Sequence, residues 1–150
     1  MTRRSLLAAA TLPAFALQDK LIPVDEAGYA KLVAAQKGKV LLVNFWATWC
    51  QPCRASFPEY QALLASYGDR VMVVGISEDD EQEGIQRFAD ETGARFPLGW
   101  DADKSVAQRY QINSMPTLFI IDPSGLVRYV HAGFRAGDEA SIRAAIDSLL

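Results

Sequence analysis

Metal-binding side chains are scarce in this sequence. Its 150 residues include two cysteines, Cys50 and Cys53, and one histidine, His131. Two cysteines three positions apart can supply half of a tetrahedral zinc site, but that site needs two further ligands. A single histidine cannot provide both, so we expect no metal centre. No partner for His131 is evident from the sequence.

An excess of basic residues is also missing. The formal net charge is −3 and the sequence pI is about 5.1. Proteins that bind nucleic acid need lysines and arginines to neutralise phosphates, so we expect no nucleic-acid partner. Half of the residues are hydrophobic, and the length suits one domain with its own core. Client proteins or small molecules are the expected partners.

The apolar stretch near the N-terminus is too short for a typical membrane span, which takes ~20 residues. It begins at Leu6 after Arg3 and Arg4 and ends in the small-x-small step Ala14-Phe15-Ala16. This layout predicts a secretory signal peptide over residues 1–16, cleaved after export by the general secretory or the twin-arginine route. An uncleaved leader that anchors the chain, and an ordinary amphipathic first helix, are the alternatives.

The two cysteines are poor candidates for a structural staple. They enclose only Gln51 and Pro52. A disulfide that closes so short a loop restricts the unfolded chain very little, because the entropic effect grows with loop length. Reversible sulfur chemistry is the better explanation of this spacing.

Predicted helices and strands alternate along residues 22–150. The apolar run 40–46 is typical of a strand buried on both faces. A turn separates two further predicted strands, 117–121 and 126–131, and this pattern predicts an antiparallel hairpin. The sequence therefore predicts an α/β fold with a central mixed, mostly parallel sheet and helices on both faces. The other predicted elements are helices at 23–37, 51–67, 85–92, 103–110 and 138–150, and strands at 71–76 and 96–100.

Cys50 lies where a buried strand gives way to a helix. Unpaired backbone N–H groups at a helix start stabilise a thiolate, the form of cysteine that attacks disulfides. Cys53, one helical turn later, is placed to resolve the mixed disulfide. Pro52 restrains the connecting backbone at a position that needs no N–H donor. Gln51 is the position that tunes the reduction potential of the pair.

Two segments carry a family resemblance. The first is Asn44-Phe45-Trp46-Ala47-Thr48-Trp49-Cys50-Gln51-Pro52-Cys53-Arg54, and the second is Ser114-Met115-Pro116-Thr117-Leu118-Phe119-Ile120-Ile121-Asp122. They resemble the active-site segment and the cis-proline strand of the thioredoxin superfamily, in particular its exported TlpA and ResA-like branch. The resemblance implies a thioredoxin fold over residues 22–150.

The resemblance also implies roles around the catalytic pair. Pro116 would be the cis proline, and the backbone of Met115 would pair with an extended substrate segment. Trp46 would pack beneath the disulfide, while Trp49 would form a docking surface with Gln51 and Pro52. Arg54 could assist thiolate formation or be a surface charge.

Two positions depart from the family pattern. Many thioredoxins have a buried aspartate where this chain has Asn44, and the TlpA and ResA-like branch keeps a glutamate where it has Ser56. Both groups are thought to deprotonate the second cysteine. Water or a carboxylate brought near by folding, with Glu78 as a weak candidate, would have to take the proton of Cys53.

The resulting hypothesis is an exported protein-disulfide reductase that acts as a monomer with no cofactor besides the Cys50–Cys53 disulfide. By resemblance, a membrane dithiol would supply electrons, and client proteins with disulfides would receive them, apocytochrome c in cytochrome c maturation among them. A peroxiredoxin-like peroxidase is one alternative, although the proline expected before its reactive cysteine is absent. A thioredoxin-fold metallochaperone or other binding module is the second.

Overall fold

The computed structural model describes residues 22–23 and 26–150. The predicted signal peptide, residues 1–16, lies outside the described residues. Across the described part of the chain, no helix is both long and apolar enough to cross a membrane. The helices are α1 (Glu26–Ala35), α2 (Gln51–Tyr67), the 3-10 turn η2 (Gly68–Arg70), α3 (Ile85–Thr92), α4 (Ser105–Arg109) and α5 (Asp138–Asp147). The strands are β1 (Ile22–Pro23), β2 (Val40–Trp46), β3 (Val71–Ser77), β4 (Leu98–Trp100), β5 (Thr117–Ile121) and β6 (Val127–Ala132).

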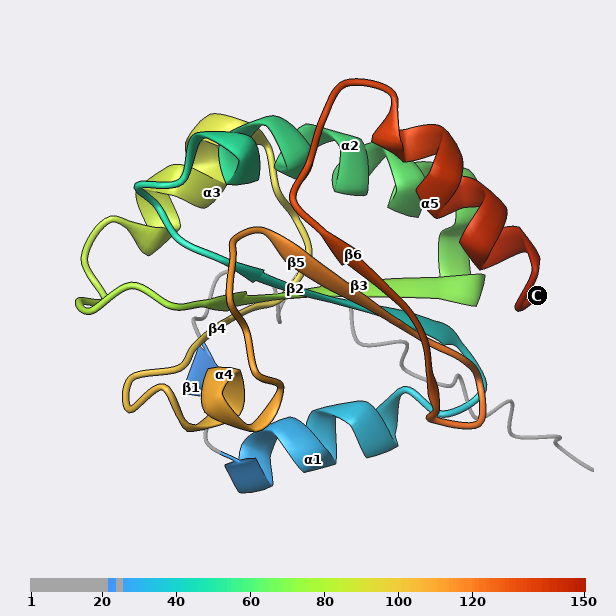
Figure 1. Ribbon diagram of the computed structural model, residues 1–150, viewed down its shortest axis with the longest axis horizontal. Helices are drawn as coiled ribbons and strands as arrows, with labels where there is room; N and C mark the ends of the chain where they lie inside the picture. Colours follow the sequence, from blue (N-terminus) through green and yellow to red (C-terminus); the bar gives the residue numbers. More distant parts are fainter. Residues whose placement is uncertain (1–21, 24–25) are drawn as a thin grey trace, which may run out of the picture.

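One mixed sheet organises the described residues, in the order β1-β4-β3-β2-β5-β6. β2 pairs with β3 in parallel and with β5 antiparallel, and β5 and β6 form the predicted antiparallel hairpin. In Figure 1, α2, α3 and α5 cover one face of the sheet, and α1 and α4 cover the other. This arrangement confirms the predicted thioredoxin fold.

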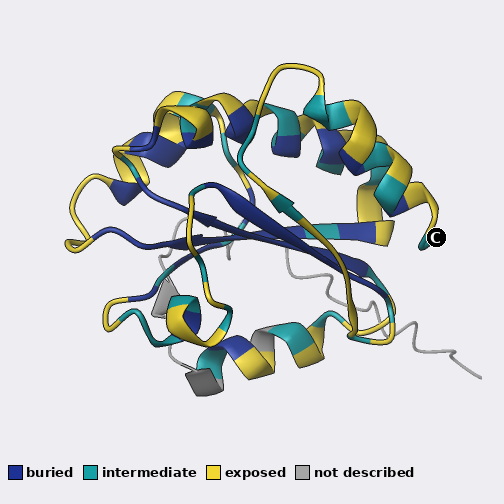
Figure 2. Ribbon diagram, in the orientation of Figure 1, coloured by how far each residue is buried: buried dark blue, intermediate teal, exposed yellow. Residues whose placement is uncertain are grey.

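All seven residues of β2 are buried, as the continuous apolar run predicts for a strand between two helical layers. Successive side chains point to opposite faces of the sheet, so they feed two cores. Phe57 of α2, Phe88 of α3 and Ile142 of α5 belong to one core. Tyr29 of α1 and Val106 of α4 belong to the other, and Figure 2 shows the buried strands between these layers.

Several element boundaries differ from the prediction for local reasons. β4 begins at Leu98, two residues later than predicted, because Pro97 has no N–H to donate to a ladder. The α4 helix begins at Ser105, where the Asp101 side chain accepts from the N–H groups of Val106 and Ala107 at 3.2 and 2.9 Å. The two-residue strand β1 was not predicted, since its pairing with β4 follows no local pattern.

The parallel pairing of β2 with β3 decides where the loops of the site meet. Trp46, the last residue of β2, is opposite Ser77, the last residue of β3. Both strands therefore end at the same edge of the sheet, as parallel strands must. The loop that leads into α2 and the loop that follows β3 start side by side at this edge.

Candidate functional site

Cys50 and Cys53 form a disulfide at the beginning of α2. Cys50 is the N-cap residue of the helix, with an extended backbone, and Pro52 lies in the first turn. Cys53 is fully buried, whereas Cys50 keeps 6% of its surface exposed. Of the two, Cys50 is therefore the cysteine that remains partly accessible.

Polar backbone groups surround Cys50 Sγ. It accepts a hydrogen bond from the backbone N–H of Cys53 at 3.3 Å. It also lies 3.5 Å from the carbonyl oxygen of Met115, which comes from the loop before β5, 65 positions along the chain. The fold thus brings the two sequence segments that carried the resemblance into contact at this sulfur.

The peptide bond between Met115 and Pro116 is cis. Two hydrogen bonds hold the flanking backbone: the Gly133 N–H donates to the carbonyl of Pro116 at 2.7 Å, and the hydroxyl of Thr117 donates to the carbonyl of Ser114 at 2.6 Å. Pro116 is buried, while Met115 is partly exposed beside the disulfide.

The two tryptophans near the cysteines differ sharply in exposure. Trp46 is fully buried in the same core as both cysteines, with its ring 4.6 Å from Phe57 and 4.7 Å from Phe88 between centroids. The side chain of Trp49 is 70% exposed. Gln51 and Pro52 are exposed as well, so Trp49, Gln51 and Pro52 form an open rim around the Cys50 sulfur.

A cavity of about 430 Å³ adjoins this rim. Trp49 and Met115 belong to its lining, which makes it continuous with the disulfide site. Glu78 and Lys104 supply its charged groups. The remaining lining residues are Ala107, Gln108, Gln111, Ile112, Asn113 and Ser114.

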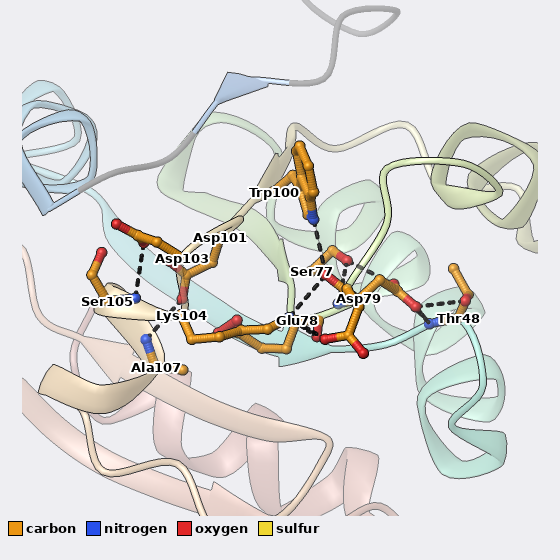
Figure 3. A network of polar contacts seen from close by, with 11 residues as sticks. Thr48, Ser77, Glu78, Asp79, Trp100, Asp101, Asp103, Lys104, Ser105 and Ala107 are labelled. Atoms are coloured by element: carbon orange, nitrogen blue, oxygen red, sulfur yellow. Dashed lines mark hydrogen bonds and ion pairs between the residues drawn. The ribbon is translucent and has the colours of Figure 1, made fainter.

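Glu78 is a buried acid at the end of β3. Burial, together with the neighbouring Asp101 carboxyl, raises the pKa of Glu78 to about 9. Neither carboxyl oxygen has a hydrogen-bond partner of good geometry among the described residues. Figure 3 shows Glu78 close to Asp101 and Lys104. No hydrogen bond joins the Glu78 carboxyl to either cysteine in the described part of the chain.

Asn44 and Ser56 occupy the positions of the two missing family carboxylates. Both are fully buried. Asn44 lies on the same face of β2 as Leu42 and Trp46, because residues two positions apart in a strand point to the same side, so its amide faces the core that holds the cysteines. Neither amide atom has a hydrogen-bond partner among the described residues. The Ser56 hydroxyl donates to the carbonyl of Cys53 at 2.8 Å. Neither side chain can accept a proton as a carboxylate does.

Arg54 and His131 have partners outside the site. Arg54 forms an ion pair with Glu91 at 3.1 Å and lies over the ring of Phe88, at 4.5 Å from the ring centroid. The sequence showed no partner for His131, but its Nε2 lies 2.9 Å from Asp138 Oδ2. In the described part of the chain, no three His, Cys, Asp or Glu side chains are grouped so that they could hold a metal ion.

Sequence reasoning missed Asp79, a buried acid beside the site. Its carboxylate accepts hydrogen bonds from the backbone and the hydroxyl of Thr48, two residues before Cys50. One signal could have pointed to it. Asp79 lies three residues after the end of the predicted strand 71–76, and the carboxyl ends of parallel strands are where loops of α/β proteins gather functional groups.

Relatives of the chain share its sequence over most of the fold. It is 34% identical over 114 residues to the thioredoxin-like protein YneN of Bacillus subtilis, covering 74% of this chain and 66% of that protein. It is 38% identical over 98 residues to the thiol-disulfide oxidoreductase ResA of Oceanobacillus iheyensis, covering 65% of this chain and 51% of ResA. The chain therefore spans half to two thirds of the length of these curated relatives.

A solved structure and a family model agree with this similarity. A crystal structure of a Chlorobium tepidum protein, assigned as the thiol:disulfide interchange protein DsbE, matches with a TM-score of 0.75 and 31% identity. The match covers 78% of this chain and 84% of that protein. The model of the AhpC/TSA family matches residues 9–130. The chain belongs to the AhpC/TSA family of thioredoxin-like proteins.

Proposed function

We propose that this chain is a thiol-disulfide oxidoreductase that reduces disulfides in client proteins through Cys50 and Cys53. One observation carries the proposal. A disulfide lies at the first turn of α2, with its outer sulfur accepting a backbone N–H and an exposed rim around it. The names of the ResA and DsbE relatives support the same chemistry.

The first step is attack by Cys50. In the reduced protein, the Cys50 thiolate attacks one sulfur of a client disulfide. A bond forms between Cys50 Sγ and that sulfur, the client S–S bond breaks, and the second client sulfur leaves as a thiolate that takes a proton from solvent. The Cys53 N–H, 3.3 Å from Cys50 Sγ, and the positive end of the α2 dipole stabilise the attacking thiolate.

The second step is resolution by Cys53. Cys53 loses its proton and attacks Cys50 Sγ, which releases the first client sulfur as a thiolate and closes the Cys50–Cys53 disulfide. Two electrons pass to the client, whose disulfide becomes a dithiol. Asn44 and Ser56 offer no carboxylate for this proton, and burial raises the pKa of Glu78 to about 9, so in this proposal water takes the proton of Cys53.

A client segment would bind along the rim. Met115 is partly exposed and its carbonyl oxygen lies 3.5 Å from Cys50 Sγ, so an extended segment would add at Met115 as a short strand. Trp49, Gln51 and Pro52, which are exposed next to Cys50 in the sequence, would offer side-chain contacts. The adjoining cavity of about 430 Å³ gives room for one client side chain.

The compartment and the partners complete the proposal. The basic and apolar leader supports export, by the general secretory or twin-arginine route, and periplasmic action, with an uncleaved anchor as the alternative. A membrane dithiol would then return the protein to its reduced form by the reverse exchange. Apocytochrome c is one client that the family resemblance suggests, and the chain would act as a monomer with no other cofactor.

Reduction of insulin disulfides by the purified protein tests the activity. With a chemical dithiol as electron source, we expect turnover by the unaltered chain and none by Cys50→Ser. Hydrogen peroxide, offered to the same preparation, tests the peroxidase alternative, and we expect no consumption above the dithiol background. Loss of peroxide without insulin reduction would overturn the proposal in favour of a peroxidase, and neither activity would favour a binding module.

A further inference from the structure

Asp79 binds the turn that carries Cys50. Its two carboxylate oxygens lie 3.2 and 3.0 Å from the backbone nitrogen of Thr48, and the Thr48 hydroxyl donates to Oδ1 at 2.7 Å. Asp79 is 6% exposed, so these hydrogen bonds are largely shielded from water. Charge-assisted hydrogen bonds of this kind are stronger than neutral ones.

Asp79 is itself held from three directions. The Ser77 hydroxyl donates to Oδ2 at 2.7 Å, and the Asp79 N–H donates back to that hydroxyl oxygen at 3.1 Å. The Asp79 carbonyl accepts from Trp100 Nε1 at 2.9 Å and from Lys104 Nζ at 2.8 Å. Figure 3 shows these groups converging on Asp79 from β3, β4 and the start of α4. These hydrogen bonds hold Asp79 in place, so its carboxylate is positioned to bind Thr48.

The supported turn has no regular structure of its own. Residues 47–49 lie between β2 and α2, and within the turn the Cys50 N–H donates to the carbonyl of Ala47 at 3.2 Å. Thr48 stands beside Trp49, which is 70% exposed. A side chain so open to solvent receives little packing support, so the hydrogen bonds of this turn, including that between Thr48 and Asp79, are the main contacts that hold the backbone of Trp49.

We propose that Asp79 is a positioning residue for the disulfide exchange: by holding Thr48, it sets the geometry of Trp49 and of the Cys50 sulfur at the start of α2. The inference rests on the proposed function, which assigns the reaction to Cys50. Asp79 contacts neither cysteine among the described residues, so it acts through Thr48 and not as a catalytic group.

Asp79→Ala and Asp79→Asn test this role. The amide oxygen of asparagine can still accept from Thr48, and its NH₂ can donate to the Ser77 hydroxyl, so we expect Asp79→Asn to retain most of the activity. Alanine offers no acceptor, and we expect kcat/KM for insulin reduction to fall by about ten- to a hundredfold, since a displacement of ~1 Å at a reacting centre can cost about a hundredfold in rate. Cys50 in reduced Asp79→Ala should also be alkylated more slowly at neutral pH.

Asp122→Ala is the matched control for lost stability. Asp122 also accepts backbone N–H groups, those of Ser124 and Leu126 at 2.9 and 3.0 Å, but in the turn between β5 and β6. Its removal should lower the melting temperature without changing the rate of Cys50 alkylation. Equal slowing of alkylation in Asp122→Ala and Asp79→Ala would overturn the proposal, because stability alone would then explain the effect.

Thr48→Val keeps the test decisive if Asp79→Ala does not fold. Valine removes only the hydroxyl bonded to Asp79 and keeps the backbone N–H. We expect slower Cys50 alkylation in Thr48→Val, and a rate equal to that of the unaltered chain would overturn the proposal. Alkylation needs no client, so an altered alkylation rate in a protein that never reduces insulin would contradict the proposed function while leaving the positioning role intact.

Discussion

The backbone N–H of Cys53 points at the sulfur of Cys50 from 3.3 Å. This contact follows from the place of Cys50 as N-cap of α2, where the first backbone N–H groups have no partner within the helix. The two cysteines thus have unequal surroundings: Cys50 is at the exposed rim with a donor beside it, and Cys53 is fully buried. This inequality assigns attack to Cys50 and resolution to Cys53 in the proposed exchange.

Trp49→Ala should weaken client binding with little effect on stability. The side chain is 70% exposed, so its removal should change the free energy of unfolding by less than about 0.5 kcal/mol. We expect a higher KM for insulin in steady-state assays. Leu126→Ala, which removes a side chain 64% exposed in the turn between β5 and β6, is the control and should leave KM unchanged. An unaltered KM in Trp49→Ala would remove this residue from the docking surface.

Ser56→Glu should speed resolution by giving Cys53 a carboxylate. Ser56 bonds the Cys53 carbonyl, and it is close enough to Tyr60 to affect the pKa of that phenol, which burial raises. The Tyr60 hydroxyl has no partner of good geometry in the described chain, so it could donate to the new carboxylate. Overpacking should cost about 1–3 kcal/mol of stability. Stopped-flow resolution of a mixed disulfide measures the rate, and an unchanged rate and pH profile would refute the idea.

Glu78 should make the stability of the oxidised protein fall as pH rises. Its pKa is raised from the ordinary 4.5 to about 9, so between these values the folded chain holds a proton that the unfolded chain has lost. The stabilisation that Glu78 gives the folded chain is complete below pH 4.5 and is lost towards pH 9. Between these values the free energy of unfolding falls by on the order of 1 kcal/mol per pH unit.

Glu78→Gln, which stays neutral, tests the pH dependence by urea unfolding at pH 5 and pH 8. The variant should lose less stability between the two pH values than the unaltered chain does. Glu83→Gln, at an exposed position after β3, is the control and should follow the unaltered chain. Parallel losses in all three proteins would show that Glu78 is not the group responsible.

Gly75→Ala should disturb the core beneath the disulfide. A Cβ at Gly75 would lie 2.8 Å from Leu98 Cδ2 and 3.0 Å from Trp46 Nε1, so these side chains must move. We expect the free energy of unfolding, measured with urea, to fall by about 1–3 kcal/mol, and the fluorescence of Trp46 to change. Adding Leu98→Ala removes the closest contact, so the double variant should lose less than the sum of the single losses. Strict additivity would argue against this packing.

The fold could be predicted because its elements have strong local patterns. The run Val40–Trp46 is apolar except at Asn44, as expected of a strand covered on both faces, and helical spacing follows it from Gln51 to Tyr67. The position of Cys50 at their junction follows from these two patterns alone. The strand β1 could not be found in this way, since Ile22 and Pro23 form a strand only by pairing with β4.

Contacts between loops could not be predicted because they depend on strand register. Thr48 and Asp79 are 31 positions apart, and they meet because Trp46 and Ser77 are paired at the ends of β2 and β3. His131 and Asp138 meet where the chain turns from β6 into α5. Neither pair has a periodic pattern, so the sequence does not show which of these side chains meet.

Trapping of a mixed disulfide tests the central claim most directly. Cys53→Ala retains the attacking thiol and lacks the resolving one, while Cys50→Ala has the reverse. After reaction with a disulfide-containing client, mass spectrometry should find the client joined to Cys50 in Cys53→Ala and little adduct in Cys50→Ala. Recovery of the adduct on Cys53 in equal yield, or no adduct on Cys50, would contradict the assignment of Cys50 as the nucleophile.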